Sequence, residues 1–369
     1  MRVFDGKSRS CKRLKQGILM ELMLLGGLLF VWFVRLQDTA ANSALVQSPL
    51  LPKEGDPIKW VDFNVTVEAL ERAYEWDVDT YDTDHPVGWV DLLAYTAAKT
   101  GGEFSASALK TLEKAGKSLA SGETTLAELT NDLSYYGYYR EAYGAVLDGL
   151  VGEFEEEQID ETGVAVFQKQ YGLKAYFPLA SGFDYSHYDD FGAGRSYGYA
   201  RKHLGHDMAG QIGTPIVAVE SGTVEALGWN QYGGWRVGIR SMDGKRYYYY
   251  AHMRQNYPYA ENLTEGSIVT AGDVIGYMGH TGYSSTENVN NIEVVHLHWG
   301  LELIFEESQK DSDHEIWVDV YDLTQFLARH KQTAAKVNDT KEWVRTTRIN
   351  DPIVAEMLER ETGLQGFEP

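Results

Sequence analysis

The sequence predicts an α+β protein with three parts: an N-terminal transmembrane anchor, a small α-helical domain and an antiparallel all-β domain. Three observations support this prediction. An apolar run covers residues 18–34, leucine and tyrosine recur at helical spacing within 60–155, and short β-rich runs separated by glycine turns fill most of 175–330. The 369 residues are enough for two ordinary domains and a tail.

The apolar run at 18–34 is interrupted only by Glu21, and as a helix it would be about 25 Å long, close to the thickness of a bilayer core. Residues 1–35 hold seven Lys/Arg and two acidic residues. The positive-inside rule therefore places a basic tail at 1–17 in the cytoplasm and the rest of this single-pass protein of the cell membrane outside. A cleaved signal peptide, which would release a secreted protein, is the alternative. Residues 35–59, with three prolines, are expected to form a linker.

The formal net charge of −21 limits the partners of the chain. Because the N-terminal segment is basic, the rest of the protein is strongly acidic and repels phosphate groups, which argues against nucleic acid as a partner. The single cysteine, Cys11, falls on the cytoplasmic side of the predicted topology. No intramolecular disulfide can form, and a cysteine-rich structural zinc site is nearly excluded.

The helical domain is expected at 60–155, where an acidic run at 153–157 marks its end. It contains no catalytic grouping, and we expect its many tyrosines to pack in a core, with a ligand surface as the alternative. We expect this domain either to regulate access to a site or to contact an envelope protein partner. The helical spacing is clearest at Leu126, Leu129, Leu133 and Tyr136.

The β-rich region contains a strong hairpin signal, Asp243-Gly244, and a histidine pair on a predicted strand. Alternation along Val294–Ile304 directs His296 and His298 to one face, together with Gly300 and Glu302. Alone, a His-x-His pair is a weak signal. The other face of the strand carries Val295, Leu297, Trp299, Leu301 and Leu303.

A second element, HLGHD, places His203 and Asp207 four residues apart with Gly205 between them, where a tight turn can bring the imidazole and the carboxylate together. With one strand histidine they would form a set of two histidines and one aspartate. Three protein ligands that leave a position open to water are the arrangement of a catalytic zinc ion. A simple ion pair within the turn is the alternative.

Five segments taken in order resemble the lysostaphin/LytM-type zinc metallopeptidases. The segments are FGAGR at 191–195, HLGHD at 203–207, YAHM at 250–253, GHTG at 279–282 and HLH at 296–298. The resemblance covers residues 180–305 and implies a compact β fold with a groove across a sheet, within a zinc peptidase domain at 175–330. It implies one Zn²⁺ per chain bound by His203, Asp207 and His298, catalytic histidines at His252 and His296, and cleavage of peptides in bacterial peptidoglycan.

The resemblance has a chemical rationale, because zinc can lower the pKa of a bound water to roughly 7. We assign His296 as the base that accepts the proton of the water, and His252 as a hydrogen-bond partner of the water or of the oxyanion, although the two roles could be exchanged. The stretch between GHTG and HLH is longer than the usual connection of the family, so it is expected to reshape one wall of the groove. The tail at 331–369 carries no identified chemistry.

The sequence therefore predicts a membrane-anchored, extracytoplasmic zinc endopeptidase that hydrolyses peptidoglycan stem or cross-bridge peptides. Two alternatives remain. One is a catalytically weak, metal-stabilised scaffold or binding module of the cell envelope, and the other is a zinc peptidase for protein substrates. Release of new amino groups from cell walls would distinguish the peptidoglycan endopeptidase from the scaffold.

Overall fold

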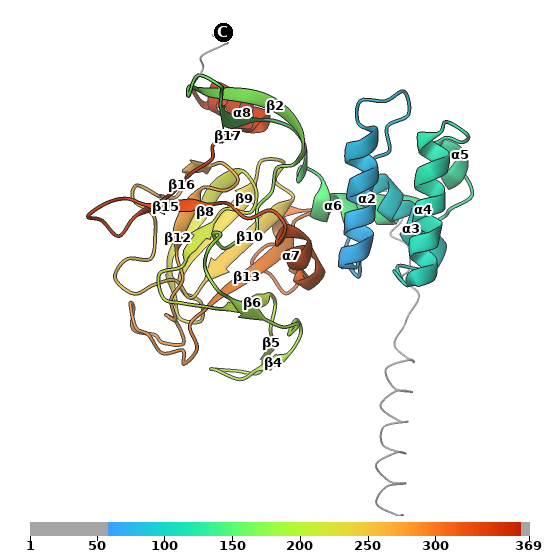
Figure 1. The fold of residues 1–369 in the computed structure, drawn as a ribbon. Helices are drawn as coiled ribbons and strands as arrows, with labels where there is room; N and C mark the ends of the chain where they lie inside the picture. The colour runs from blue at the N-terminus through green and yellow to red at the C-terminus, as the bar shows by residue number, and fades with distance from the viewer. Residues whose placement is uncertain (1–57, 363–369) are drawn as a thin grey trace, which may run out of the picture. The chain divides into compact units, whose positions relative to one another are not determined.

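The computed structural model describes residues 58–362 of the chain (Figure 1). The predicted basic tail at 1–17, the anchor at 18–34 and nearly all of the linker at 35–59 lie outside this part. Within residues 58–362, no helix has both the length and the apolar character needed to span a membrane. The described residues belong to one compact unit.

Five α-helices follow one another in the first part of the described chain (Figure 1). Local sequence explains several of their ends. The Thr66 side chain accepts a hydrogen bond from the Ala69 amide at the start of the first helix, and Gly101 ends the second helix with a φ of 70°. The helices are α2 Val67–Thr80, α3 Trp89–Thr100, α4 Ala106–Ala120, α5 Leu126–Thr130 and α6 Tyr136–Leu147.

The apolar spacing from Leu126 to Tyr136 belongs to two helices, whereas the pattern alone suggests one. Helix α5 ends at Thr130 and α6 begins at Tyr136. The segment between them contains Asn131 and Asp132, whose side chains compete for backbone hydrogen bonds and favour turns. The tyrosines pack as expected: the ring centroids of Tyr139 and Tyr143 lie 5.4 Å apart, and Tyr143 is fully buried.

The acidic run at 153–157 lies within a strand and does not connect two domains. It belongs to β1 Val151–Ile159, which pairs along its whole length with β2 Ala165–Leu173. Asp160 begins the hairpin turn, and its Oδ1 accepts the amide hydrogens of Thr162 and Val164. An exposed hairpin tolerates acidic side chains because they reach water, and Glu157 pairs with Arg348.

The β-rich region forms an antiparallel sheet, as predicted, with the strand order β11-β8-β9-β10-β13-β6-β3 and with β14 also paired to β13 (Figure 1). Strands β7 and β12 form a separate pair, and so do β4 and β5. The strands are β3 Ser186–His187, β4 Gly194–Arg195, β5 Arg201–Lys202, β6 His206–Ala209, β7 Pro215–Val217, β8 Gly222–Asn230, β9 Gly234–Ser241, β10 Arg246–Ala251, β11 Ile268–Val269, β12 Val274–Tyr277, β13 His296–Leu303 and β14 Ile316–Val318.

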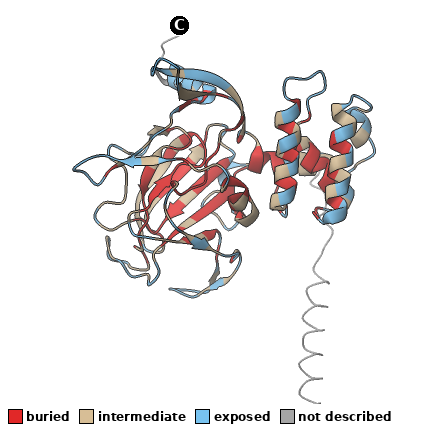
Figure 2. Cartoon of the chain, viewed as in Figure 1, coloured by how far each residue is buried: buried red, intermediate tan, exposed pale blue. Residues whose placement is uncertain are grey.

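Strand β13 divides its side chains between a core and a groove, as the alternation predicts. Leu297, Trp299, Leu301 and Leu303 are fully buried, and the sheet strands are largely buried in Figure 2. The other face carries both strand histidines. The predicted hairpin is also present: Asp243 accepts the Lys245 amide, and Gly244, with a φ of 77°, completes the turn between β9 and β10.

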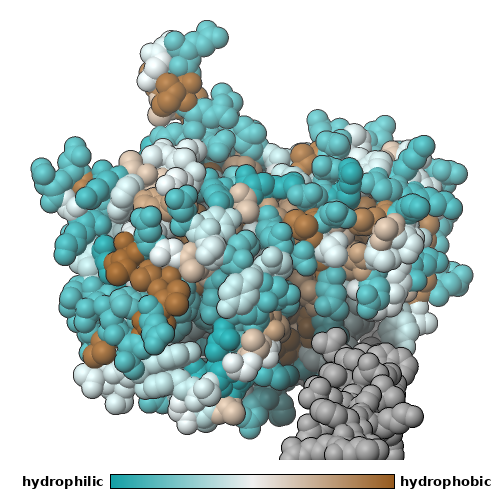
Figure 3. Space-filling view, turned by 60° about the horizontal axis from the view of Figure 1, so that its bottom comes forward, coloured by the Kyte–Doolittle hydropathy of each residue, from teal (hydrophilic) through white to brown (hydrophobic). Residues whose placement is uncertain are grey.

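The chain beyond residue 330 belongs to the fold, although the sequence assigns it no chemistry. Glu342 accepts hydrogen bonds from Tyr257 and Tyr277, and Asp351 pairs with Lys174. The outer surface is mostly hydrophilic on the face shown in Figure 3, in keeping with the charge of the chain. Helix α7 Tyr321–Leu327 precedes this part. The elements beyond residue 330 are β15 Ala334–Lys336, β16 Trp343–Arg345, β17 Ile349–Asn350, which pairs with β1, and α8 Pro352–Thr362.

Hydrogen bonds of buried groups connect the helical part to the β sheet. The Arg246 guanidinium on β10 is 1% exposed, pairs with Glu220 and donates to the Ala145 carbonyl in α6. Asp322 in α7 accepts the Val67 amide at the start of α2. Removal of one partner would leave a buried charge without compensation, so loss of Glu220 or Arg246 should weaken the contact between the two parts.

Candidate metal centre and catalytic groove

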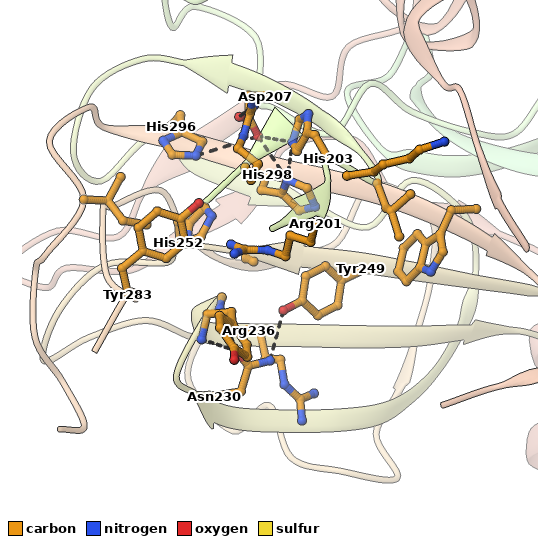
Figure 4. A pocket seen from close by; sticks show the side chains of 18 of the residues that line it. Arg201, His203, Asp207, Asn230, Arg236, Tyr249, His252, Tyr283, His296 and His298 are labelled. Atoms are coloured by element: carbon orange, nitrogen blue, oxygen red, sulfur yellow. Dashed lines mark hydrogen bonds and ion pairs between the residues drawn. The ribbon is translucent and has the colours of Figure 1, made fainter. Parts of the chain in front are cut away.

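The three predicted metal ligands lie together near the start of β13 (Figure 4). Register brings two of them together, because His298 on β13 is directly opposite Asp207 on β6, and the chain entering β6 carries the third, His203. His203 Nε2 lies 2.9 Å from His298 Nδ1 and 3.0 Å from Asp207 Oδ1, and the last two atoms are 3.0 Å apart. The donor atoms thus form a nearly equilateral triangle.

The hydrogen bonding around this triangle indicates that lone pairs point at its centre. His203 Nδ1 lies 3.2 Å from the Asp190 carbonyl oxygen and can only donate to it. Neutral His203 therefore has its proton on Nδ1 and a lone pair on Nε2, which faces the carboxylate oxygen of Asp207. Two lone pairs at this distance repel each other unless a cation lies between them. Two imidazoles and one carboxylate are ligands that zinc prefers, so the donor set fits this ion.

Charged neighbours hold Asp207 in its ligand position. Arg195 Nη2 donates to Asp207 Oδ2 at 3.1 Å and to Asp190 Oδ2 at 2.6 Å, which leaves Asp207 Oδ1 for the triangle. Burial lowers the pKa of His298, so this imidazole stays neutral, as a metal ligand must.

His296 and His252, the two predicted catalytic histidines, lie beside the triangle with their ring centroids 4.7 Å apart. His296 Nδ1 donates to the Val294 carbonyl oxygen at 2.8 Å, and His252 Nδ1 donates to the Thr281 carbonyl oxygen at 2.9 Å. In the neutral forms, Nε2 of both rings is therefore a hydrogen-bond acceptor. His296 Nε2 lies 3.7 Å from Asp207 Oδ1, so it faces the metal site.

The backbone around His252 is constrained. His252 has a φ of 63°, in the left-handed region that non-glycine residues rarely adopt. Its amide donates to the Gly233 carbonyl, and its carbonyl accepts the Gly279 amide, so neighbouring segments hold this conformation. Such strain is found where a side chain must be directed to a functional position.

The histidines lie in one wall of a groove with a volume of about 950 Å³. Tyr283 stacks on Tyr197 with 4.6 Å between ring centroids and stands beside His252 in Figure 4. Tyr249 on β10 accepts a hydrogen bond from Asn230 and contributes to the floor. Residues 291–294, from the long connection between GHTG and HLH, also line the groove, in keeping with the prediction that this stretch shapes a wall.

Gly205 has a different role from the one that the sequence suggests. We expected its backbone freedom to allow a tight turn, but its φ is not in the left-handed region. A β carbon at this position would lie 2.6 Å from the His298 ring. The glycine is therefore required by close approach of the backbone to a ligand side chain.

Three residues of the site were not assigned from the sequence: Asp190, Arg195 and Tyr283. Arg195 is the last residue of the FGAGR segment, Asp190 directly precedes it, and Tyr283 directly follows GHTG. Proximity to these segments is the only signal that could have indicated them. His206, next to Asp207, points to the opposite face of β6, where its Nε2 lies 2.8 Å from His187 Nδ1.

Residues 201–311 match peptidase family M23. An L-Ala--D-Glu endopeptidase from Bacillus subtilis (strain 168) is 33% identical over 188 residues, which cover 47% of this chain and 56% of the relative. Lysostaphin from Staphylococcus simulans is 36% identical over 89 residues, which cover 24% of this chain and 17% of that protein.

Among solved structures, the catalytic domain of lysostaphin from Staphylococcus simulans is 29% identical, with a TM-score of 0.29 and coverage of 38% of this chain and 92% of that one. The chain spans about half the length of the Bacillus subtilis relative and less of lysostaphin. Residues 201–311, which hold the five clustered site residues, are therefore similar to peptidase family M23, and the similarity extends to its lysostaphin/LytM-type members.

Proposed function

We propose that this protein is a zinc-dependent endopeptidase that hydrolyses peptide bonds in peptidoglycan stem or cross-bridge peptides. The observation that carries the proposal is the triangle of His203, Asp207 and His298 next to two further histidines whose Nε2 atoms are acceptors. Metal-donor atoms and proton acceptors side by side in an open groove are what hydrolysis of a peptide bond requires.

The triangle would bind zinc, which supplies an activated water and polarises the carbonyl of the scissile bond. Side chains of the protein transfer the protons. His296 Nε2 accepts the proton of the attacking water, because its other nitrogen is held as a donor by the Val294 carbonyl, and it then passes the proton to the leaving amine. His252 Nε2 is an acceptor too, so it orients the water. We assign the Tyr283 hydroxyl, a hydrogen-bond donor in the same groove, to the developing oxyanion.

The substrate class follows from the relatives. The Bacillus subtilis relative is an L-Ala--D-Glu endopeptidase, and a further relative, 34% identical over 89 residues, is a glycyl-glycine endopeptidase from Staphylococcus capitis. Both names specify peptide bonds, and the L-Ala–D-Glu bond is our first candidate because that relative matches more of this chain. The groove is open and large enough for an extended peptide of several residues.

We also propose that the protein is anchored in the cell membrane with residues 1–17 in the cytoplasm and the catalytic domain outside. The support is the apolar run at 18–34 and its basic N-terminal flank. Protease treatment of intact spheroplasts should degrade residues 58–362, and a full-length protein that survives would contradict the orientation.

Digestion of purified peptidoglycan tests the function. The zinc-loaded protein should release fragments with new amino termini, identified by mass spectrometry, and a chelator should abolish release. The expected bond is L-Ala–D-Glu. Tight zinc binding without release of any fragment from walls of different cross-bridge types would overturn the proposed activity and favour a binding module.

A further inference from the structure

A second ionisable group projects into the groove, away from the metal triangle. Glu302 is on the same face of β13 as His298 and lines the same groove. The two are four positions apart, a distance of about 13 Å along the strand. Glu302 is only 2% exposed, and its Oε1 is buried without a hydrogen-bond partner among residues 58–362. A buried carboxyl group in this state is costly unless it binds something.

Two cations whose charge acts on Glu302 are engaged by other acids. Arg240 on β9 pairs with Glu225 and Glu307, and Lys310 pairs with Glu225. In the part of the chain that the structure describes, no lysine or arginine forms an ion pair with Glu302. The carboxyl group is therefore left to the groove.

The surroundings of Glu302 are acidic and aromatic. Across the sheet, Tyr247 on β10 and Trp317 on β14 lie directly opposite Glu302. Burial raises the pKa of Glu302 to about 8, with further contributions from Glu315 and Asp311 that exceed the opposing effect of Lys310 and Arg240. The carboxyl group is therefore mostly protonated at neutral pH, and a positive charge placed beside it would favour its ionised form.

We propose that Glu302 is the centre of a subsite that binds a primary ammonium group on the substrate peptide. The proposal deepens the proposed function, since it names a specificity-determining residue of the same groove. An ammonium group fits because it is compact and offers three hydrogen-bond donors to the unpartnered oxygen. Trp317 adds aromatic surface that attracts a cation, whereas the Tyr247 ring already has the Lys310 ammonium 4.8 Å from its centroid.

The geometry of the strand supports this assignment. A β carbon at Gly300 would lie 2.8 Å from the Trp317 ring, so glycine allows the indole to pack closely against β13 between His298 and Glu302. An extended peptide advances about 3.4 Å per residue. A long amine-bearing side chain on the second residue from the scissile bond can therefore cover the distance from the metal triangle to Glu302.

Binding measurements test the subsite without relying on turnover. The full chain carrying His296→Ala, which we expect to be inactive, is titrated with L-Ala–D-Glu–L-Lys and with the same peptide acetylated on the lysine Nε. Acetylation should weaken binding ten-fold or more, the scale of one charge-assisted hydrogen bond. Adding Glu302→Gln should make the two peptides bind alike. Glu75→Gln is the matched control, since this exposed acid pairs with Arg72 in α2, neither residue lines the groove, and its loss should leave the preference unchanged.

Equal binding of the two peptides to the His296→Ala protein overturns the subsite, and this comparison needs no change at Glu302. A full preference that survives Glu302→Gln overturns it as well. Cleavage of the same peptides by the unmodified protein is measured separately. Failure to cleave either peptide counts against the proposed activity, while a lost preference in binding counts against Glu302 alone.

Discussion

Strand β6 has a histidine cluster on each side, and only one of them can hold a metal. On the groove side, two imidazoles meet the Asp207 carboxylate, with donor atoms 2.9–3.0 Å apart. On the other side, His206 and His187 form a single contact of 2.8 Å and pack against the Tyr321 ring. Because burial lowers the pKa of both histidines, the second pair is a neutral donor and acceptor that needs no ion. A carboxylate and a third metal-donor atom therefore distinguish a metal site from a structural histidine pair.

The largest effect should come from Asp207→Asn, which makes the groove cluster resemble the pair on the other side of the strand. Loss of the negative ligand should lower zinc affinity by more than the ten- to hundred-fold that is typical of removing an outer partner of a ligand. Peptide hydrolysis should disappear with the metal. Competition with a chelator measures the affinity, and thermal unfolding confirms that the variant is folded. Unchanged zinc affinity would show that the carboxylate is not a ligand.

A nearly equal loss of turnover should follow His296→Ala, but without loss of metal. The histidine that accepts the proton typically contributes roughly 10²–10⁴-fold to the rate. His298→Ala is the matched variant two residues away on the same strand face, and it should lose zinc as well as activity. Metal content of the purified proteins separates the two. Retained zinc and activity in His298→Ala would remove the ligand assignment.

A smaller effect is expected for Arg195→Met, because Arg195 positions Asp207 and does not contact the donor triangle. Zinc affinity should fall roughly 10–100-fold. Arg345→Met is the control, since Arg345 pairs with Asp273 away from the groove. If both variants bind zinc equally well, Arg195 does not position the ligand.

The smallest effect on the metal should come from His187→Phe, which keeps the aromatic packing and removes the partner of His206. Zinc affinity and turnover should stay unchanged. The free energy of unfolding should fall by about 1–3 kcal/mol, the cost of a buried polar group without a partner. Urea denaturation and a zinc titration measure the two quantities. A variant that loses zinc would mean that the two sides of β6 are not independent.

Much of the site could be predicted because its parts are short motifs. Alternation along a strand is a local property, so the two faces of β13 were predicted correctly, and of the predicted strand only Val294, Val295 and Ile304 lie outside β13. The same rule would have excluded His206 from the groove once Asp207 was assigned to it, since adjacent residues on a strand point to opposite faces. The break between α5 and α6, and the acidic strand β1, were missed because spacing and charge are compatible with more than one local structure.

By itself, the sequence indicated which side chains belong to the candidate site and the local direction of each on its strand or turn. The tertiary structure brought these side chains together. His203 and His298 are 95 residues apart, and the pairing of β6 with β13 places His203 Nε2 2.9 Å from His298 Nδ1. It also decided that Gly205 serves close packing and that Glu302 has no cationic partner in the described chain. Local rules extend over a few residues, whereas strand register and burial depend on the whole sheet.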